Sequence, residues 1–403
     1  MRVGRTPRGQ IAEGRRGLGI RVGMVGVGAF ARAFIPLFQA HPLVDEVALC
    51  DLDAAKLQDV TARSGLSKTY PSLDALCESD VDAVVIITQH WLHGPQAVHA
   101  LRAGKHVYSA VPTGITVEEI ATLVRTVEES GLVYMLGETS YYYPAVLYCR
   151  RRYAADDFGA IVYAEGEYYH DWDHGLYDVF RWRGGERWRE VAGSPPMHYP
   201  THSTSQIISV TGAHMTHVSC QGFVDHAGDG LYGPKANRWG NVFSNETALF
   251  QMSDGSSCRI NEFRRIGHPE VVRMSLFGTT ASFEANSAGS MWLTKDPAQA
   301  RRLDDELAPR GVTTEHGMYL NLSPVHPVER LPREFANLPS GHEGSHAFLV
   351  DDFVRACAAG TTPPNNVWMA ARYALPGIVA HESAVRGGEL LEVPDFGDPP
   401  TRR

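Results

Sequence analysis

A glycine-rich turn near the start of the chain has the residue types that bind a dinucleotide. An apolar run, Val22–Val25, leads into Gly26 and Gly28, and a predicted helix begins at Ala29 and Phe30. Gly26 permits a tight turn and Gly28 lets the backbone approach a pyrophosphate, while the first amides of the helix point toward the phosphates. The stretch therefore predicts a dinucleotide-binding turn.

A carboxylate follows at the spacing that such a site requires. Asp51 ends a second apolar run, 47–50, and lies about 20 residues beyond the turn, where an acid accepts hydrogen bonds from a ribose diol. A carboxylate there repels the 2′-phosphate of NADP, so the sequence predicts NAD. The alternative is an ordinary strand, turn and helix with a solvated aspartate.

A third apolar strand, 82–88, ends in polar residues that face the same sheet edge. Ligands bind at the carboxyl ends of parallel strands. The candidate cofactor contacts in this loop are Thr88, Gln89, His90 and His93. His93 either contacts the cofactor or caps the next helix.

The elements that carry these residues predict two domains. From residue 20 to 139 strands and helices alternate, which indicates an α/β Rossmann domain with a doubly wound parallel sheet. From 140 to 403 strand-like runs follow one another, which favours an α+β domain with a largely antiparallel open sheet. Residues 297–344 lack periodicity and are predicted to form a long surface excursion over a site or over a partner subunit. Residues 1–19 are predicted to form a disordered arm.

The composition of the chain argues against some classes of binding partner. The 403 residues carry a net charge of −9, which argues against a nucleic acid. No long apolar span indicates a membrane segment, and no secretory h-region is found, so we expect a cytoplasmic protein. The six cysteines lie in apolar runs without paired spacing, which predicts reduced core residues.

Several segments together resemble the Gfo/Idh/MocA oxidoreductase superfamily, from about Arg21 to Phe396. The resemblance rests on the glycine turn, Asp51, the loop 88–93, the run 103–107 and Trp188-Arg189 ahead of His202. It implies a Rossmann domain joined to an open-sheet domain, NAD(P)-dependent chemistry on a sugar hydroxyl, and a dimer or tetramer. It also implies that Trp188 and Arg189 lie near the cofactor.

The departures from that superfamily point to one branch. Its dehydrogenases usually carry Glu-Lys-Pro after the His-Val strand, and the lysine helps to move a proton; here the residues are Ala110, Val111 and Pro112. The chain instead resembles the NAD-dependent glycosidases of glycoside hydrolase family 109. The shared segments are Val111-Pro112, 135–138 ending in Glu138, 168–171, 199–202 and the terminal 393–396. The Gly-x-Gly-Pro that follows the histidine in that family is replaced by 203–206, which puts its N-acetylgalactosamine specificity in doubt.

By this resemblance Glu138, Tyr168 and His202 take the places of functional residues, with Val111, Pro112 and Glu138 at the cofactor. Tyr168, His202 and His170 are the candidate catalytic groups, because tyrosine and histidine can transfer protons when their pKa values are tuned. The candidate substrate contacts are Tyr142, Trp172, His198 and Tyr199.

Each candidate has a structural alternative. Tyr168 fits a packed aromatic on a strand, and His202 fits a helix cap or a core histidine. The run 170–174 has ligand-type side chains, but its spacing matches no standard zinc motif, so we predict no metal. The run 141–144 lines the cleft or packs at the domain junction.

The sequence therefore predicts a redox-neutral glycosidase that oxidises a sugar, eliminates the aglycone, adds water and reduces the product again. The alternatives are an NAD-dependent sugar or polyol dehydrogenase and a non-catalytic sugar sensor. The expected partner is a small carbohydrate or glycoside.

Overall fold

The first part of the chain folds into a parallel sheet of six strands. The computed structural model describes residues 19–400, so the predicted arm lies outside them except for Gly19. The strand order is β3-β2-β1-β4-β5-β6, and the pairs are all parallel. The strands are β1 (Ile20–Val25), β2 (Val44–Cys50), β3 (Thr69–Tyr70), β4 (Ala83–Ile86), β5 (His106–Ser109) and β6 (Tyr134–Leu136). The predicted Rossmann architecture is confirmed.

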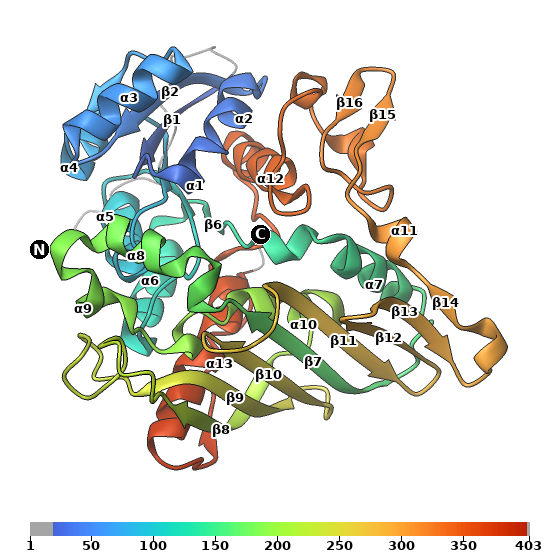
Figure 1. The fold of residues 1–403 in the computed structure, drawn as a ribbon. Helices are drawn as coiled ribbons and strands as arrows, with labels where there is room; N and C mark the ends of the chain where they lie inside the picture. The colour runs from blue at the N-terminus through green and yellow to red at the C-terminus, as the bar shows by residue number, and fades with distance from the viewer. Residues whose placement is uncertain (1–18, 401–403) are drawn as a thin grey trace, which may run out of the picture.

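Helices connect these strands and cover the sheet (Figure 1). They are α1 (Ala29–Arg32), α2 (Ile35–Ala40), α3 (Ala54–Ser64), α4 (Leu73–Cys77), α5 (His93–Arg102) and α6 (Val117–Ser130). The strands β1 and β4 are almost wholly buried because helices pack on both faces of a parallel sheet.

The second sheet has nine strands in the order β14-β13-β12-β11-β7-β10-β9-β8-β17. Only β7 and β10 pair in parallel, so the sheet is mixed and largely antiparallel, as expected. Its strands are β7 (Ile161–Tyr169), β8 (Met215–Val224), β9 (Phe243–Met252), β10 (Ser257–Phe263), β11 (Val271–Gly278), β12 (Ala281–Asn286), β13 (Gly289–Thr294), β14 (Arg301–Arg302) and β17 (Leu391–Glu392).

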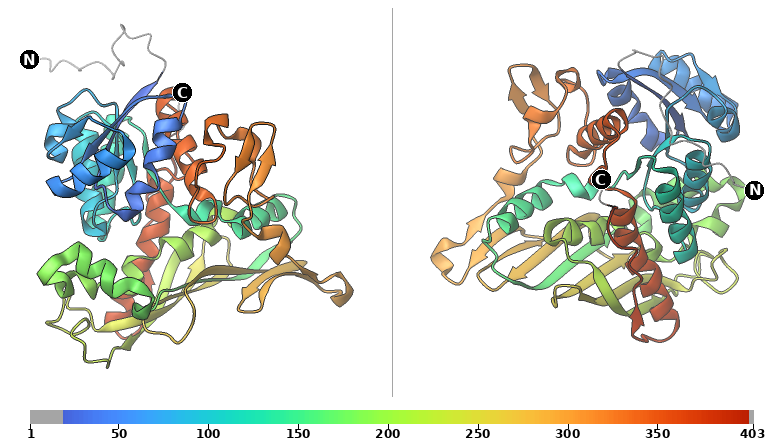
Figure 2. Two further views of the ribbon diagram at one scale, coloured as in Figure 1. Left: turned by 45° about the horizontal axis from the view of Figure 1, so that its top comes forward. Right: turned by 180° about the vertical axis from the view of Figure 1, so that it is seen from behind.

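Helices lie on one face of this larger sheet (Figure 2). They are α7 (Pro144–Ala154), α10 (Thr201–Thr211) and α13 (Val367–Val385), while α8 (Tyr177–Gly184) and α9 (Trp188–Ala192) lie toward the first domain. The side chains of Tyr168, Glu262 and Glu246 point to the helix side, because the three residues are opposite one another in the register of β7, β10 and β9.

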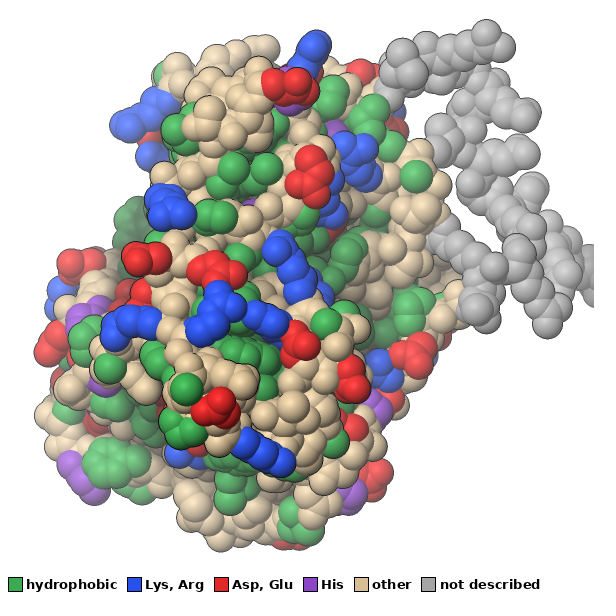
Figure 3. Space-filling model, turned by 90° about the vertical axis from the view of Figure 1, so that its right-hand side faces the viewer, with side chains coloured by type: hydrophobic (Ala, Val, Ile, Leu, Met, Phe, Trp, Pro, Cys, Tyr) green, Lys and Arg blue, Asp and Glu red, His purple; other side chains and the backbone are tan. Residues whose placement is uncertain are grey.

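The segment 297–344 differs from the predicted surface excursion. It contains β14, α11 (Asp304–Leu307) and the hairpin of β15 (Val312–Thr314) and β16 (Gly317–Tyr319), and it buries Leu322 and Phe335. Its buried residues lie in short turns and recur with no common period, so the sequence pattern does not predict their burial. The side of the molecule that carries β13–β16 has acidic and basic side chains interspersed (Figure 3).

The last helices return to the first sheet. Helix α12 (Ser345–Ala359) packs on β1 and α2, and α13 packs on α6 and β6. The boundary at residue 139 stays a prediction. Within residues 19–400 no helix is both long and apolar enough to cross a membrane, and the six cysteines are free and buried.

Candidate active site

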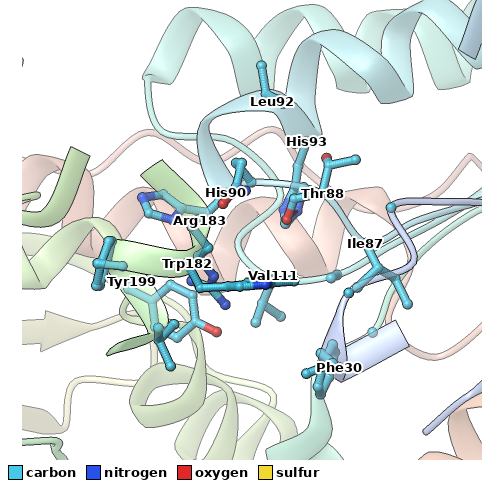
Figure 4. A pocket seen from close by; sticks show the side chains of 18 of the residues that line it. Phe30, Ile87, Thr88, His90, Leu92, His93, Val111, Trp182, Arg183 and Tyr199 are labelled. Atoms are coloured by element: carbon cyan, nitrogen blue, oxygen red, sulfur yellow. Dashed lines mark hydrogen bonds between the residues drawn. The ribbon is translucent and has the colours of Figure 1, made fainter. Parts of the chain in front are cut away.

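A cavity of about 1280 Å³ lies between the carboxyl edge of the first sheet and the helix-covered face of the second. Phe30 lies at one end of the view in Figure 4 and Tyr199 at the other, with Val111 between them. Fourteen predicted site residues line the cavity: Gly26, Gly28, Ala29, Phe30, Asp51, Thr88, Gln89, His90, His93, Val111, Tyr168, His170, His202 and Tyr199, and two more, Trp172 and His198, join them. The fold thus brings the three predicted catalytic residues and most of the predicted cofactor residues into one space.

The glycine turn has the geometry that the sequence predicted. Gly26 has a φ of +86°, and a Cβ on it would lie 2.3 Å from the Ile87 carbonyl oxygen, so only glycine fits. Gly28 precedes α1 in an extended conformation, and no side chain caps the first amides of the helix. These amides are available to a phosphate.

Asp51 holds the turn against the end of β2. Its Oδ2 accepts a hydrogen bond of 3.0 Å from the Val27 amide, and its Oδ1 accepts one of 2.9 Å from the Asp53 amide. Each carboxylate oxygen keeps a lone pair for a ribose hydroxyl. Gln89 lines the same cavity with a buried Oε1 that has no hydrogen-bond partner in the described part of the chain. The turn, the carboxylate and the unpartnered amide oxygen fit a dinucleotide.

His93 joins two loops of the first sheet. Its Nδ1 lies 2.9 Å from the Pro112 carbonyl oxygen and its Nε2 lies 3.2 Å from that of Thr88. Burial lowers the pKa of His93 to about 4, so the ring is neutral and donates to one carbonyl at a time. His93 opens α5 and lines the cavity, which leaves its predicted contact with the cofactor a prediction.

Glu138 and His202 form a buried pair at the part of the cavity that Tyr168 also lines. The His202 Nδ1 lies 2.7 Å from the Glu138 Oε1, which also accepts a 2.9 Å hydrogen bond from the Ser140 amide. Burial opposes the charged imidazolium, but the carboxylate outweighs it and raises the pKa of His202. Burial likewise opposes the carboxylate, and the charge and hydrogen bond of His202 outweigh it and lower the pKa of Glu138. His202 is thus held in place by a carboxylate.

Tyr168 has a proton acceptor and a cation beside it. Its hydroxyl donates to the His170 Nδ1 at 2.7 Å, and the Arg264 guanidinium lies 4.7 Å from the ring centroid. Burial raises the pKa of Tyr168 well above 10, while Arg264 acts in the opposite direction. His170 also approaches Glu270 at 3.4 Å. The phenol can pass a proton to His170 and receive one from a substrate.

Arg264 is a residue that the sequence analysis missed. It lies one residue beyond β10, lines the cavity and donates to the Glu262 Oε2 at 3.1 Å, while the Ser203 hydroxyl donates to the other oxygen at 2.5 Å. Burial raises the pKa of Glu262 to about 7. The only sequence signal was a Glu-x-Arg spacing at a strand end, which is common on surfaces.

Five predicted residues do not line the cavity. Pro112 and Glu138 lie behind it, where they hold His93 and His202. Trp188 is buried in a cluster with Trp172 and Phe180, and Arg189 lies over the Trp188 ring. Tyr142 stacks on Phe348 and donates to Asp352, away from the cavity.

A second Trp-Arg pair reaches the cavity instead. Trp182 and Arg183 on α8 both line it (Figure 4). The Trp182 ring lies 3.1 Å from where a Cβ on Gly28 would be, and the Lys56 Nζ lies 4.3 Å from its centroid. Burial lowers the pKa of Arg183, and the phenols of Tyr199 and Tyr168 favour its charge. The sequence holds both pairs six residues apart, so the motif alone did not distinguish them.

Metal-ligating side chains do not gather at the run 170–174. Asp171 instead accepts hydrogen bonds from the amides of Ile266 and Asp173. Within residues 19–400 no three such side chains are placed to hold a metal ion.

Comparison with known proteins identifies the first domain. Residues 20–138 match the model of an oxidoreductase family with an NAD-binding Rossmann fold, so NAD is the cofactor of this domain. The chain is 24% identical over 408 residues to a glycosyl hydrolase family 109 protein of Saccharopolyspora erythraea, covering 94% of this chain and 83% of that protein. The chain is also 29% identical over 215 residues to an alpha-N-acetylgalactosaminidase of Bacteroides fragilis, and this alignment covers 48% of this chain and 49% of that protein.

Solved structures share the two-domain fold. Levoglucosan dehydrogenase in complex with NADH and L-sorbose has a TM-score of 0.74 at 19% identity, covering 94% of this chain and 100% of that one. The scyllo-inositol dehydrogenase of Lactobacillus casei with NAD(H) and scyllo-inositol has a TM-score of 0.67 at 18% identity, covering 93% and 99%. The predicted resemblance and fold class are confirmed.

Proposed function

We propose that this chain, which belongs through residues 20–138 to the NAD-binding Gfo/Idh/MocA oxidoreductases, is a glycosidase that returns its cofactor unchanged. The observation that carries this proposal is that the pair Tyr168–His170 shares a single cavity with the glycine turn and with His202, which Glu138 holds from behind. The rings of Tyr168 and His202 lie 5.6 Å apart between centroids, which allows both to reach one sugar.

When bound, NAD supplies a reversible hydride acceptor for a sugar carbon such as C3. His202 takes the proton of the hydroxyl that is oxidised, and Glu138 stabilises the imidazolium. Tyr168 then takes the C2 proton, which the neighbouring ketone has made acidic. His170 receives the phenolic proton and donates it to the aglycone oxygen as the C1–O bond breaks. Water then adds across C1 and C2: its oxygen bonds to C1, its proton passes to His170, and Tyr168 gives a proton to C2. The ketone regains the hydride that the oxidation removed together with the proton held by His202, and His170 returns its proton to the Tyr168 oxygen.

The residue at position 111 separates this function from its alternative. Among the described residues that line the cavity, Lys56 is the only lysine, and it lies at the Asp51 end. A sugar dehydrogenase of the superfamily usually places a lysine where Val111 stands, so a plain dehydrogenase would have to move its proton through another group, His202 or Tyr168. The dehydrogenase remains the second candidate because the solved structures named above are sugar dehydrogenases.

The two candidates differ in their products. A panel of nitrophenyl glycosides, incubated with and without added NAD⁺, should release aglycone while the absorbance of NADH stays flat. Stoichiometric NADH beside an uncleaved keto-sugar would favour the dehydrogenase, and tight sugar binding without either product would favour a sensor.

The first testable prediction concerns the choice of cofactor. Replacing Asp51 by alanine should weaken NAD⁺ binding about 10- to 100-fold, because a hydrogen bond to a charged group contributes about 1.5–3 kcal/mol. Asp51→Asn is the matched variant, since its amide oxygen can still accept from the Val27 amide. Asp51→Asn should reduce the ratio of the affinity for NAD⁺ to the affinity for NADP⁺, because it removes the charge that repels the 2′-phosphate. Calorimetric titration of both dinucleotides measures this, and tighter binding of NADP⁺ to the unaltered protein would contradict it.

The second prediction concerns assembly. One face of the larger sheet points away from α10 and carries ion pairs such as Arg273–Glu167. On the same face Leu249 is 57% exposed to solvent. We propose that a second copy covers this face in a dimer or tetramer. Light scattering at micromolar concentration should report an oligomer, and Leu249→Arg should shift it toward the monomer. A monomeric unaltered protein would refute the proposal.

A further inference from the structure

The turn Gly341–Gly344 ends the irregular segment and begins α12 in a strained conformation. His342, Glu343 and Gly344 have φ values of +47°, +53° and +92°, all in the left-handed region. Residues other than glycine adopt this region rarely, and such strain is retained where the surrounding structure holds it for a purpose. Gly341 and His342 line the cavity, together with His346 from the first turn of α12.

The two histidines pack against α1, which follows the glycine turn, and against Phe34, the residue that precedes α2. The His346 ring stacks on Phe34 with centroids 4.2 Å apart, and the His342 ring meets Phe30 edge-on at 5.3 Å. Phe30 belongs to α1, directly after Gly28 and Ala29. The residues that the sequence analysis left unassigned are therefore part of the cofactor end of the cavity.

A hydrogen bond fixes the proton on His342. The His342 Nδ1 and the His346 Nε2 lie 2.9 Å apart, and the His346 Nδ1 is buried with no hydrogen-bond partner among residues 19–400. Burial lowers the pKa of His342 to about 4 and that of His346 to about 3, so both rings are neutral near pH 7.

The position of the unpartnered atom selects one tautomer. A proton on the His346 Nδ1 would be an orphaned buried donor, which proteins avoid more strictly than an unused acceptor. His346 therefore carries its proton on Nε2 and donates it to the His342 Nδ1. His342 then carries its own proton on Nε2, the atom that is free to act as a donor.

His342 lies in the same cavity as His202. Its ring touches Phe30 beside the glycine turn, and His202 lines the part of the cavity that also holds Tyr168. The nicotinamide half of a dinucleotide whose phosphates lie on the glycine turn must pass between these residues, because hydride transfer needs it beside His202.

We propose that His342 is a positioning residue for the nicotinamide ring, with its Nε2–H, oriented by His346, donating to the carboxamide oxygen. The proposal rests on NAD as cofactor and not on the glycosidase reaction. His342 does not take part in the transfer of hydride or of any proton.

Binding of two ligands to two matched variants tests this role. His342→Asn tolerates the left-handed backbone and keeps an acceptor for the His346 proton, but it no longer reaches the cavity. His342→Gln places an amide N–H near the position of the imidazole Nε2. The ligands are NAD⁺ and ADP-ribose, which lacks the nicotinamide ring, and the readout is the dissociation constant from calorimetric titration.

We expect His342→Asn to weaken NAD⁺ about 5- to 10-fold, as loss of one neutral hydrogen bond implies, with ADP-ribose unchanged within about twofold. His342→Gln should restore NAD⁺ binding. An equal loss for both ligands would show that His342 only supports the turn, and no change for either ligand would show that it does not contact the cofactor. Pyridine adenine dinucleotide, which lacks the carboxamide, should bind the unaltered protein and His342→Asn equally well. Unequal binding of this analogue would also overturn the proposal. These results stand whether or not the protein cleaves glycosides.

Discussion

Tyr168→Phe should lower the rate of glycoside cleavage about 10²- to 10⁴-fold, the range that a positioned general base contributes. The substitution removes only the hydroxyl that donates to the His170 Nδ1 at 2.7 Å, and it leaves the ring beneath Arg264. Burial keeps the phenol protonated in the free protein, so its basicity depends on Arg264 and on acceptance of its proton by His170. NAD⁺ binding should stay near that of the unaltered protein.

Exchange with solvent identifies the step that is lost. If elimination occurs, hydrolysis in D₂O places deuterium at C2 of the product sugar, which nuclear magnetic resonance detects directly. Tyr168→Phe should suppress this exchange even where slow oxidation of the sugar persists. A product without deuterium at C2 from the unaltered protein would reject the elimination mechanism.

The next residue on the strand supplies a matched control. Tyr169 points to the opposite face of the sheet, where it stacks on Phe263 with centroids 5.0 Å apart. Tyr169→Phe removes a hydroxyl from the same strand without reaching the cavity. It should therefore retain both cleavage and exchange, which separates the chemistry of Tyr168 from the stability of β7.

The Rossmann domain could be predicted in detail because its signals are local. A buried strand such as β4 reads as one apolar run, and the glycine turn and Asp51 follow strands directly. The sequence alone also predicts a strand over 161–169 and a helix over 345–359, and these are the bounds of β7 and α12. In both cases the pattern of apolar residues extends over enough positions to define the element, although single residues at its ends carry little information.

The rest of the site depends on contacts between distant segments. Arg264 gains its role from the register that sets β10 beside β7, and His342 gains its role from α12 packing on the first sheet. Trp182 and Arg183 could not be chosen over Trp188 and Arg189 without knowing which helix faces the cavity. Residue type predicts a site residue when the end of one strand fixes where its side chain lies. It does not do so when packing between two domains fixes that position.

Glu138→Gln should move the acidic limb of kcat/KM to lower pH. His202 must be neutral to accept the hydroxyl proton, so activity rises as pH passes through its pKa, which Glu138 raises above the ordinary 6.5. Glutamine removes the charge but keeps an acceptor for the Ser140 amide. Burial, the largest cause, then lowers the pKa of His202 with the help of the Arg264 charge and against the smaller effect of the Glu262 charge, so the limb should fall below pH 6.5. Ser140→Ala, which removes only a 3.4 Å contact with the His202 Nδ1, should leave the limb in place.

The same substitution should change stability in a defined window of pH. The raised pKa of His202 contributes stability that is complete below 6.5 and is lost as pH rises through the higher value in the folded protein. The lowered pKa of Glu138 contributes stability that is complete above 4.5 and is lost as pH falls through the lower value. The deficit of Glu138→Gln should therefore be largest between pH 4.5 and 6.5 and shrink on either side. We expect about 2 kcal/mol, below the roughly 3–5 kcal/mol for breaking a buried ion pair, because His202 can release its proton when the carboxylate is lost. Urea unfolding across this range measures the deficit, and a deficit that does not vary with pH would show that Glu138 and His202 do not titrate as a pair.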